Sequence, residues 1–134
     1  MQTFLPYKDF KKSASVLDYR RLGKQRVEAR QILDTLEGRS KGWVNHPIVN
    51  MWRGHELALK LYFNIMSIEW MNRGYKQTMM LYRISRKNKV DYPEWLGDNK
   101  FHLSHQSNLL RKDYEYYKKY FTNIPDNLPY VWVK

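Results

Sequence analysis

Apolar residues recur every three or four positions along much of the chain, the spacing that places them on one face of a helix. The stretch between Asp18 and Gly38 begins and ends with residue types that cap helices. Its apolar positions are Leu22, Val27, Ala29, Ile32, Leu33 and Leu36. This pattern predicts a long helix, and Asp9 predicts a shorter one before it, through about residue 17.

The most apolar stretch, residues 48–73, predicts a single central packing helix. Pro47 suits its first turn, Gly54 is a weak point inside it, and Gly74 ends it. His55 lies within this apolar stretch, so we expect it to be a hydrogen-bonded histidine of the core.

Weaker signals follow in the second half of the chain. A third helical stretch is expected at residues 77–84, followed by a basic exposed loop at 85–89. Asp98 predicts a helix through residue 111, and Asp113 predicts a short one through residue 121. The prolines in the tail, residues 125–133, argue against helix. Because strand signals are weak, we expect one compact all-α domain over residues 1–134, with an extended aromatic C-terminal tail packed on it.

The charge balance points to a polyanionic partner. Lys and Arg number 24 and Asp and Glu 13, which gives a net charge of +11. Such an excess favours phosphate binding through counterion release, although a solubility role is the alternative. The absence of cysteine excludes disulfides, thiolate zinc sites and a cysteine nucleophile. With no signal peptide and no apolar run near the roughly 18 residues of a membrane span, we expect a cytoplasmic protein. We also expect it to be a monomer.

Glu28 is the acidic residue with the most suggestive surroundings. It follows a basic cluster on the same predicted helix, formed by Arg20, Arg21, Lys24 and Arg26. A carboxylate beside cations can belong to a structural ion pair, can pair with Lys24 one helical turn away, or can act as a catalytic acid. The residues alone leave these three interpretations open.

Histidines and further cations are candidates for phosphate contacts. His102 and His105 are three residues apart, but no thiolate and no third ligand is near, so no metal is expected. No cofactor motif is present. His46 stands at a predicted helix start, where either phosphate binding or capping is favourable. The phosphate candidates outside the helix of Glu28 are Lys41, His46, His102, His105, Arg111 and Lys112.

Three segments resemble the pyrimidine dimer DNA glycosylase/AP lyase family, the endonuclease V type first known from phage, which has bacterial and viral relatives. The first is residues 17–28, LDYRRLGKQRVE. The second is KGWVNHP, residues 41–47, within the loop at 38–47. The third is HLSHQSNLLRK, residues 102–112, together with YYKKYF, residues 116–121.

The resemblance implies an all-helical DNA repair enzyme that acts on double-stranded DNA with a bent or flipped substrate. In this family the N-terminal α-amine attacks C1′ of the damaged nucleotide, the base leaves, an imine forms, and β-elimination cuts the strand. An α-amine suits this role because far more of it is neutral near pH 7 than of a lysine side chain. The family's supporting glutamate matches Glu28, and Arg20 and Arg21 match positions that contact DNA near the lesion.

Two differences from the phage enzyme bear on the nucleophile. There a small residue follows the initiator methionine, which is removed, whereas bulky Gln2 leads us to expect that Met1 is retained and supplies the amine. Extra residues also separate the N-terminus from Glu28. Lys24 is the rival nucleophile, but a nearby carboxylate favours the protonated form of a lysine. Two alternative functions are a glycosylase for another modified base and a non-catalytic nucleic-acid-binding protein of the same fold.

Overall fold

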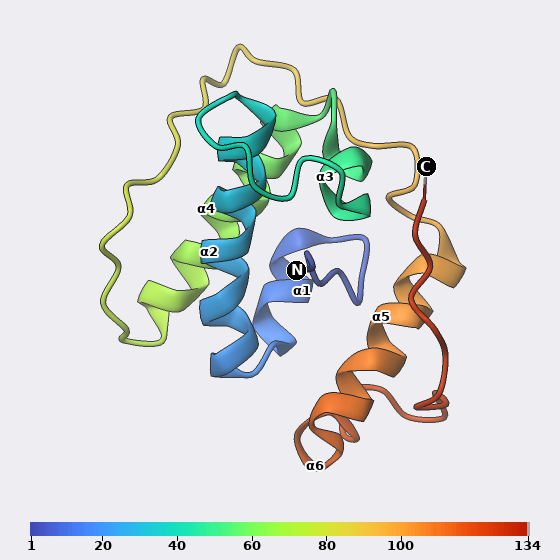
Figure 1. Ribbon diagram of the computed structural model, residues 1–134. Coiled ribbons are helices and arrows are strands. Elements are labelled where there is room, and N and C mark those ends of the chain that lie inside the picture. The colour runs from blue at the N-terminus through green and yellow to red at the C-terminus, as the bar shows by residue number, and fades with distance from the viewer. Residues whose placement is uncertain (134) are drawn as a thin grey trace.

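The computed structural model describes residues 1–133, and within them it contains six helices and no strand (Figure 1). The helices are α1 (Phe10–Val16), α2 (Tyr19–Leu36), α3 (Pro47–Trp52), α4 (Glu56–Asn72), α5 (Asn99–Lys112) and α6 (Tyr114–Tyr117). The expected all-α class is confirmed. Helix α4 packs against both α2 and α1, and α5 continues into α6 at the other side of the molecule (Figure 1). None of these helices is long and apolar enough to cross a membrane.

Aspartates begin the helices where the sequence predicts. The side chain of Asp9 accepts a hydrogen bond from the Lys12 amide at 2.9 Å, and those of Asp98 and Asp113 cap α5 and α6 in the same way. Helix α6 ends at Tyr117, earlier than the expected residue 121. Asp18 stands at the N-cap position directly before α2, but its carboxylate makes no capping bond.

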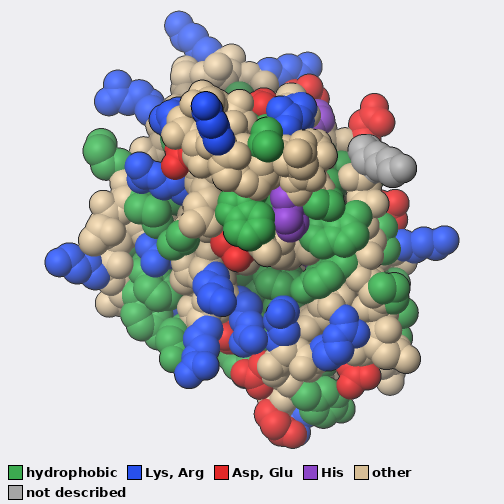
Figure 2. Space-filling model, in the orientation of Figure 1, with side chains coloured by type: hydrophobic (Ala, Val, Ile, Leu, Met, Phe, Trp, Pro, Cys, Tyr) green, Lys and Arg blue, Asp and Glu red, His purple; other side chains and the backbone are tan. Residues whose placement is uncertain are grey.

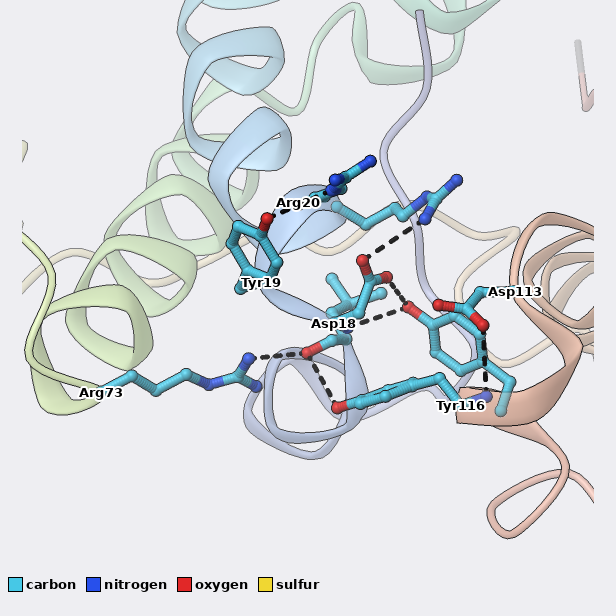
Figure 3. A network of polar contacts seen from close by, with 9 residues as sticks. Asp18, Tyr19, Arg20, Arg73, Asp113 and Tyr116 are labelled. Atoms are coloured by element: carbon cyan, nitrogen blue, oxygen red, sulfur yellow. Dashed lines mark hydrogen bonds and ion pairs between the residues drawn. The ribbon is translucent and has the colours of Figure 1, made fainter.

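The carboxylate of Asp18 instead belongs to a buried polar network between helices (Figure 3). It accepts a hydrogen bond from the Tyr117 hydroxyl, and the Asp18 amide donates to the same hydroxyl oxygen at 2.9 Å. The neighbouring carbonyl of Leu17 accepts hydrogen bonds from Arg73 at 2.7 Å and from Tyr116 at 3.4 Å. The corner between α1 and α2 is therefore joined to the end of α4 and to α6.

The single helix expected over residues 48–73 is wrong. Gly54 has a φ of +87°, a left-handed conformation that glycine adopts without steric cost, and the chain forms α3 and α4 on either side of it. His55 is therefore not a core histidine. It stands at the start of α4, a quarter of its side chain is exposed, and its Nδ1 lies 3.1 Å from the Asp91 carbonyl oxygen.

The helix expected at residues 77–84 is also wrong, because a side chain of α4 binds this segment's backbone. Asn64 of α4 accepts from the Tyr82 amide at 2.9 Å and donates to the Tyr82 carbonyl at 2.8 Å. Met80 is 86% exposed, so the apolar residues here do not share one buried face. The segment runs extended around the outside of the helices (Figure 1).

The tail packs on the body as expected. The amides of Leu128 and Val131 donate to the hydroxyls of Ser107 and Ser104, at 3.0 and 3.2 Å. The Tyr130 ring lies edge-on to the His105 ring. Figure 1 shows the tail running beside α5 toward α3, while the N-terminus lies in the middle of the molecule.

Candidate active site

Met1 is half-buried and residues 2–6 are buried, although none of them forms helix or strand. Such a segment must find other partners for its backbone N–H and C=O groups. The Phe4 amide donates to Gln25 of α2 at 2.7 Å, and the Phe4 carbonyl accepts from the Tyr62 hydroxyl of α4 at 2.9 Å. The side chain of Trp52 donates to Thr3 at 3.0 Å. Helices α2, α3 and α4 thus fix the N-terminal segment through side chains.

Two histidines of α5 bind the next residue. The Leu5 amide donates to Nδ1 of His105 at 2.9 Å, and Nδ1 of His102 lies 2.8 Å from the Leu5 carbonyl oxygen. Burial lowers the pKa of His105 to about 3 and also lowers the pKa of His102, so both rings are neutral near pH 7. The sequence placed His102 and His105 among the phosphate candidates. The structure places them in the interior, and we leave both out of the proposed DNA surface.

The N-terminal residue lines a cleft of about 380 Å³. Its lining comes from the N-terminal segment, from α2, from the start of α3, from the end of α5 and from the tail. The residues are Met1, Gln2, Phe4, Arg21, Lys24, Gln25, Glu28, His46, Lys112, Tyr130 and Trp132. The cleft therefore brings together six of the residues singled out in the sequence: Met1, Arg21, Lys24, Glu28, His46 and Lys112.

Glu28 contacts the N-terminal segment rather than the neighbouring lysine. Its Oε2 accepts a hydrogen bond from the Gln25 side chain at 3.2 Å and one from the Gln2 amide at 3.4 Å. In the described part of the chain Lys24 and Glu28 form no ion pair, so the interpretation of Glu28 as the helix partner of Lys24 has no support here. The carboxylate therefore contacts the amide that directly follows Met1, the residue that carries the α-amine.

Two rings that line the cleft, those of Tyr130 and His46, are uncharged near pH 7. Burial raises the pKa of Tyr130 to about 12; Arg111 opposes this rise and the charge of Glu28 adds to it. Burial, followed by the positive charge of the N-terminal amine, lowers the pKa of His46. Nδ1 of His46 accepts from the Ile48 amide at 3.0 Å, so the neutral ring carries its proton on Nε2. The capping role considered for His46 is confirmed.

The remaining basic candidates of α2 lie outside the cleft. Arg20 is exposed and its Nε donates to the Tyr19 hydroxyl at 3.2 Å. Arg26 is half-buried, with its guanidinium 4.2 Å from the centre of the Trp70 ring and hydrogen-bonded to Gln77. Arg26 therefore holds the segment after α4, and we do not count it as a DNA contact.

The candidates outside α2 also differ in their surroundings. Lys41 is exposed in the loop before α3, and Lys112 lines the cleft. Arg111 donates to the carbonyls of Asp126 and Leu128, at 2.9 and 3.2 Å, and so fastens the tail to α5. Within residues 1–133 no group of three or more His, Asp or Glu side chains is placed to hold a metal ion.

Five residues of the cleft were not among the site residues expected from sequence: Gln2, Phe4, Gln25, Tyr130 and Trp132. Gln25 had a usable signal, because it lies three residues before Glu28 and shares its helix face. The two tail aromatics had none beyond their composition, since only the folded chain brings the tail beside the N-terminus.

The family model for pyrimidine dimer DNA glycosylase matches residues 1–83, more than half of the chain. The matched range holds α1 to α4 together with Met1 and Glu28. Helix α5 and the tail lie outside it. No curated protein and no solved structure matches the chain.

Proposed function

The chain belongs to the pyrimidine dimer DNA glycosylase family, and from that premise we propose that it removes a damaged pyrimidine from double-stranded DNA and then cuts the strand at the abasic site. The proposed nucleophile is the α-amine of Met1. One observation carries this proposal: Met1 and Glu28 line the same cleft, and the Glu28 carboxylate lies 3.4 Å from the Gln2 amide nitrogen.

In the proposed reaction the neutral amine nitrogen attacks C1′ of the damaged nucleotide. An N–C1′ bond forms and the glycosidic bond breaks, and its electron pair leaves with the base, which takes up a proton. The sugar ring then opens as the C1′–O4′ bond breaks, and the amine loses its protons to give an imine. Removal of a proton from C2′ expels the 3′ phosphate by β-elimination. Hydrolysis of the imine frees the enzyme.

Glu28 is suited to act in two of these steps. A carboxylate in the same cleft as the attacking amine would stabilise the positive charge that develops on the sugar as the base leaves. The same group can accept a proton from the amine after attack. The hydrogen bond from Gln25 holds the carboxylate in place, so little reorganisation is needed when charge develops.

Retention of Met1 is proposed because the bulky Gln2 follows it. From Gln2 onward the segment is fixed by the hydrogen bonds of its backbone and side chains to the helices. Removal of Met1 would make the Gln2 nitrogen, which lies 3.4 Å from the Glu28 carboxylate, the terminal amine. Lys24 also lines the cleft and is the alternative nucleophile.

Cations at the cleft are proposed to hold the DNA backbone. Arg21, Lys24 and Lys112 line it, and Arg20 and Lys41 are exposed outside it. On the face shown in Figure 2, Lys and Arg side chains gather beside hydrophobic side chains that surround a histidine. This arrangement fits a strand whose phosphates lie on the cations while one nucleotide enters the cleft.

Covalent trapping tests the proposal. Borohydride added to the enzyme and a duplex with one pyrimidine dimer should reduce the imine to a stable protein–DNA adduct. N-terminal acetylation, or an uncleaved N-terminal extension, should abolish the adduct, whereas Lys24→Ala should bind DNA more weakly and still form it. Full trapping by the blocked protein and none by Lys24→Ala would make Lys24 the nucleophile. Trapping on abasic DNA alone would point to a different damaged base.

A further inference from the structure

Three rings form an aromatic surface at one side of the cleft. The His46 ring lies edge-on to Trp43 at 5.7 Å and to Trp132 at 5.8 Å, measured between ring centres. We refer to Trp43, His46 and Trp132 as the aromatic wall. His46 and Trp132 line the cleft itself, and Trp43 extends the wall outward. The loop before α3 and the C-terminal tail therefore meet at this point.

The wall is exposed although its rings would gain free energy by burial. Trp43 is 56% exposed and Trp132 is 40% exposed. Trp43 also has a φ of +64°, a conformation that residues other than glycine adopt at an energetic cost. His46 is held by its bond to the Ile48 amide, and Tyr130 packs on Trp132 with ring centres 5.6 Å apart. The aromatic wall is thus exposed to solvent, its rings contact ordered neighbours, and the backbone at Trp43 is strained.

The same cleft carries positive charge. Arg21, Lys24 and Lys112 line it together with His46 and Trp132. A nucleotide has a phosphate that pairs with cations and a base whose face stacks on aromatic rings. An acidic peptide would use the cations and leave the exposed indoles without a matching partner. The combination of charge and aromatic faces therefore favours a nucleotide drawn out of the DNA stack.

We propose that the aromatic wall binds the base of an unstacked nucleotide by stacking, and so determines which damaged base this chain accepts. This inference rests on the proposed function, because the nucleotide it holds is the one whose C1′ meets the N-terminal amine. Trp132 lies outside the range matched by the family model, residues 1–83, so one of the three rings of the wall is supplied by the tail of this chain.

Comparison of two substrates separates base binding from the rest of the reaction. One duplex carries a pyrimidine dimer, and the other carries a preformed abasic site, which has a C1′ to attack and no base to stack. Trp132→Ala and Trp43→Ala should slow base release from the dimer roughly tenfold or more. Both variants should trap the abasic duplex at the wild-type rate. Trp132→Phe and Trp43→Phe keep an aromatic face and should stay close to wild type on both duplexes.

A second measurement needs no catalysis. The wild-type protein should quench the fluorescence of a 2-aminopurine bulged out of a duplex, because stacking on an aromatic ring quenches this base. Trp132→Ala should restore much of the emission, whereas Trp132→Phe should restore little. Loss of trapping with the quenching retained would overturn the proposed function and leave the wall as a base-binding site. The proposed role of the aromatic wall would be overturned by any of three results. The alanine variants could lose equal activity on both duplexes, they could lose none on either, or the wild-type protein could fail to quench 2-aminopurine.

Discussion

At the scale of single residues, Glu28 is the group whose charge and contacts can be separated most cleanly. Glu28→Gln keeps the size of the side chain and an oxygen that can accept from Gln25 and Gln2. It removes only the negative charge, so we expect base release to slow about a hundredfold or more. DNA binding should stay within a fewfold of wild type. Single-turnover base release and fluorescence anisotropy measure the two quantities.

The competing view is that Glu28 only anchors the N-terminal segment. In that case Glu28→Gln would turn over like the wild-type protein, since glutamine can still make the anchoring bond. A thermal melt of the variant serves as the control, and it should match the wild type within about 1 kcal/mol because only exposed or half-buried contacts change.

His105 provides a residue-scale prediction about pH. Its pKa falls from an ordinary 6.5 to about 3 in the folded protein because the ring is buried, with a smaller effect of His102. Below about pH 6.5 His105 is therefore protonated in the unfolded chain but remains neutral in the folded protein. Stability should be complete above pH 6.5 and fall as the pH is lowered, by about 1 kcal/mol per unit from this group.

Urea unfolding between pH 7.5 and 4.5 measures this loss. His105→Asn offers an oxygen to the Leu5 amide and cannot be protonated in this range, so its stability should depend less on pH than that of the wild type. Equal stability of the wild-type protein at both ends of the range would show that the buried ring is not held neutral.

Single residues also show where sequence reasoning stops. The cluster around Glu28 could be recognised because the residues of one helix have fixed mutual positions. The spacing of His102 and His105 likewise placed them on one helix face. Whether that face meets DNA or the core depends on the buried N-terminal segment, which carries no periodic pattern of its own.

At the scale of elements, the junction of α2 with α6 makes a testable contribution to stability. Tyr117→Phe removes the hydroxyl that bonds both the amide and the buried carboxylate of Asp18. A hydrogen bond to a charged group is worth about 2 kcal/mol, and we expect a loss of this size in urea unfolding. Tyr114→Phe is the matched control, because Tyr114 is 54% exposed and should tolerate the change.

The positions where helices begin were predicted better from the sequence than any other feature of the elements. An aspartate caps through a bond to an amide two or three residues away, so the signal is entirely local. The errors arose where distant groups decided the outcome. Asn64 takes the place of helical hydrogen bonds at Tyr82, and the left-handed Gly54 divides a continuous apolar stretch into two helices.

At the scale of the whole molecule, binding to duplex DNA should depend steeply on salt. The three cations of the cleft predict a slope of log affinity against log salt of about −3 or steeper, near −0.9 for each phosphate neutralised. Lys112→Ala should reduce that slope by about one. Arg39→Ala is the control, since Arg39 is already paired with Asp34 and Glu37 at 2.9 and 2.8 Å. If the affinity for DNA did not change with salt concentration, DNA binding would have no electrostatic basis.

The site as a whole could be only partly foreseen. Six of its residues were recognisable as cations, a histidine, a carboxylate and a chain terminus, each from its own local surroundings. Their meeting in one cleft depends on the packing of α2, α5 and both ends of the chain, which no local pattern specifies. The tail aromatics belong to the site for this reason alone.

The fixed path of the N-terminal segment has a consequence for how the proposed nucleophile is prepared. An irregular chain end normally exchanges its amide hydrogens with solvent within seconds, whereas the amides of Phe4 and Leu5 are buried and bonded to Gln25 and His105. We expect them to exchange as slowly as the middle of α4, a difference that deuterium-exchange mass spectrometry resolves. The conformational entropy of the N-terminal segment is then lost when the protein folds, before DNA binds. DNA would meet an amine already in position, and no part of the binding energy would be needed to immobilise it.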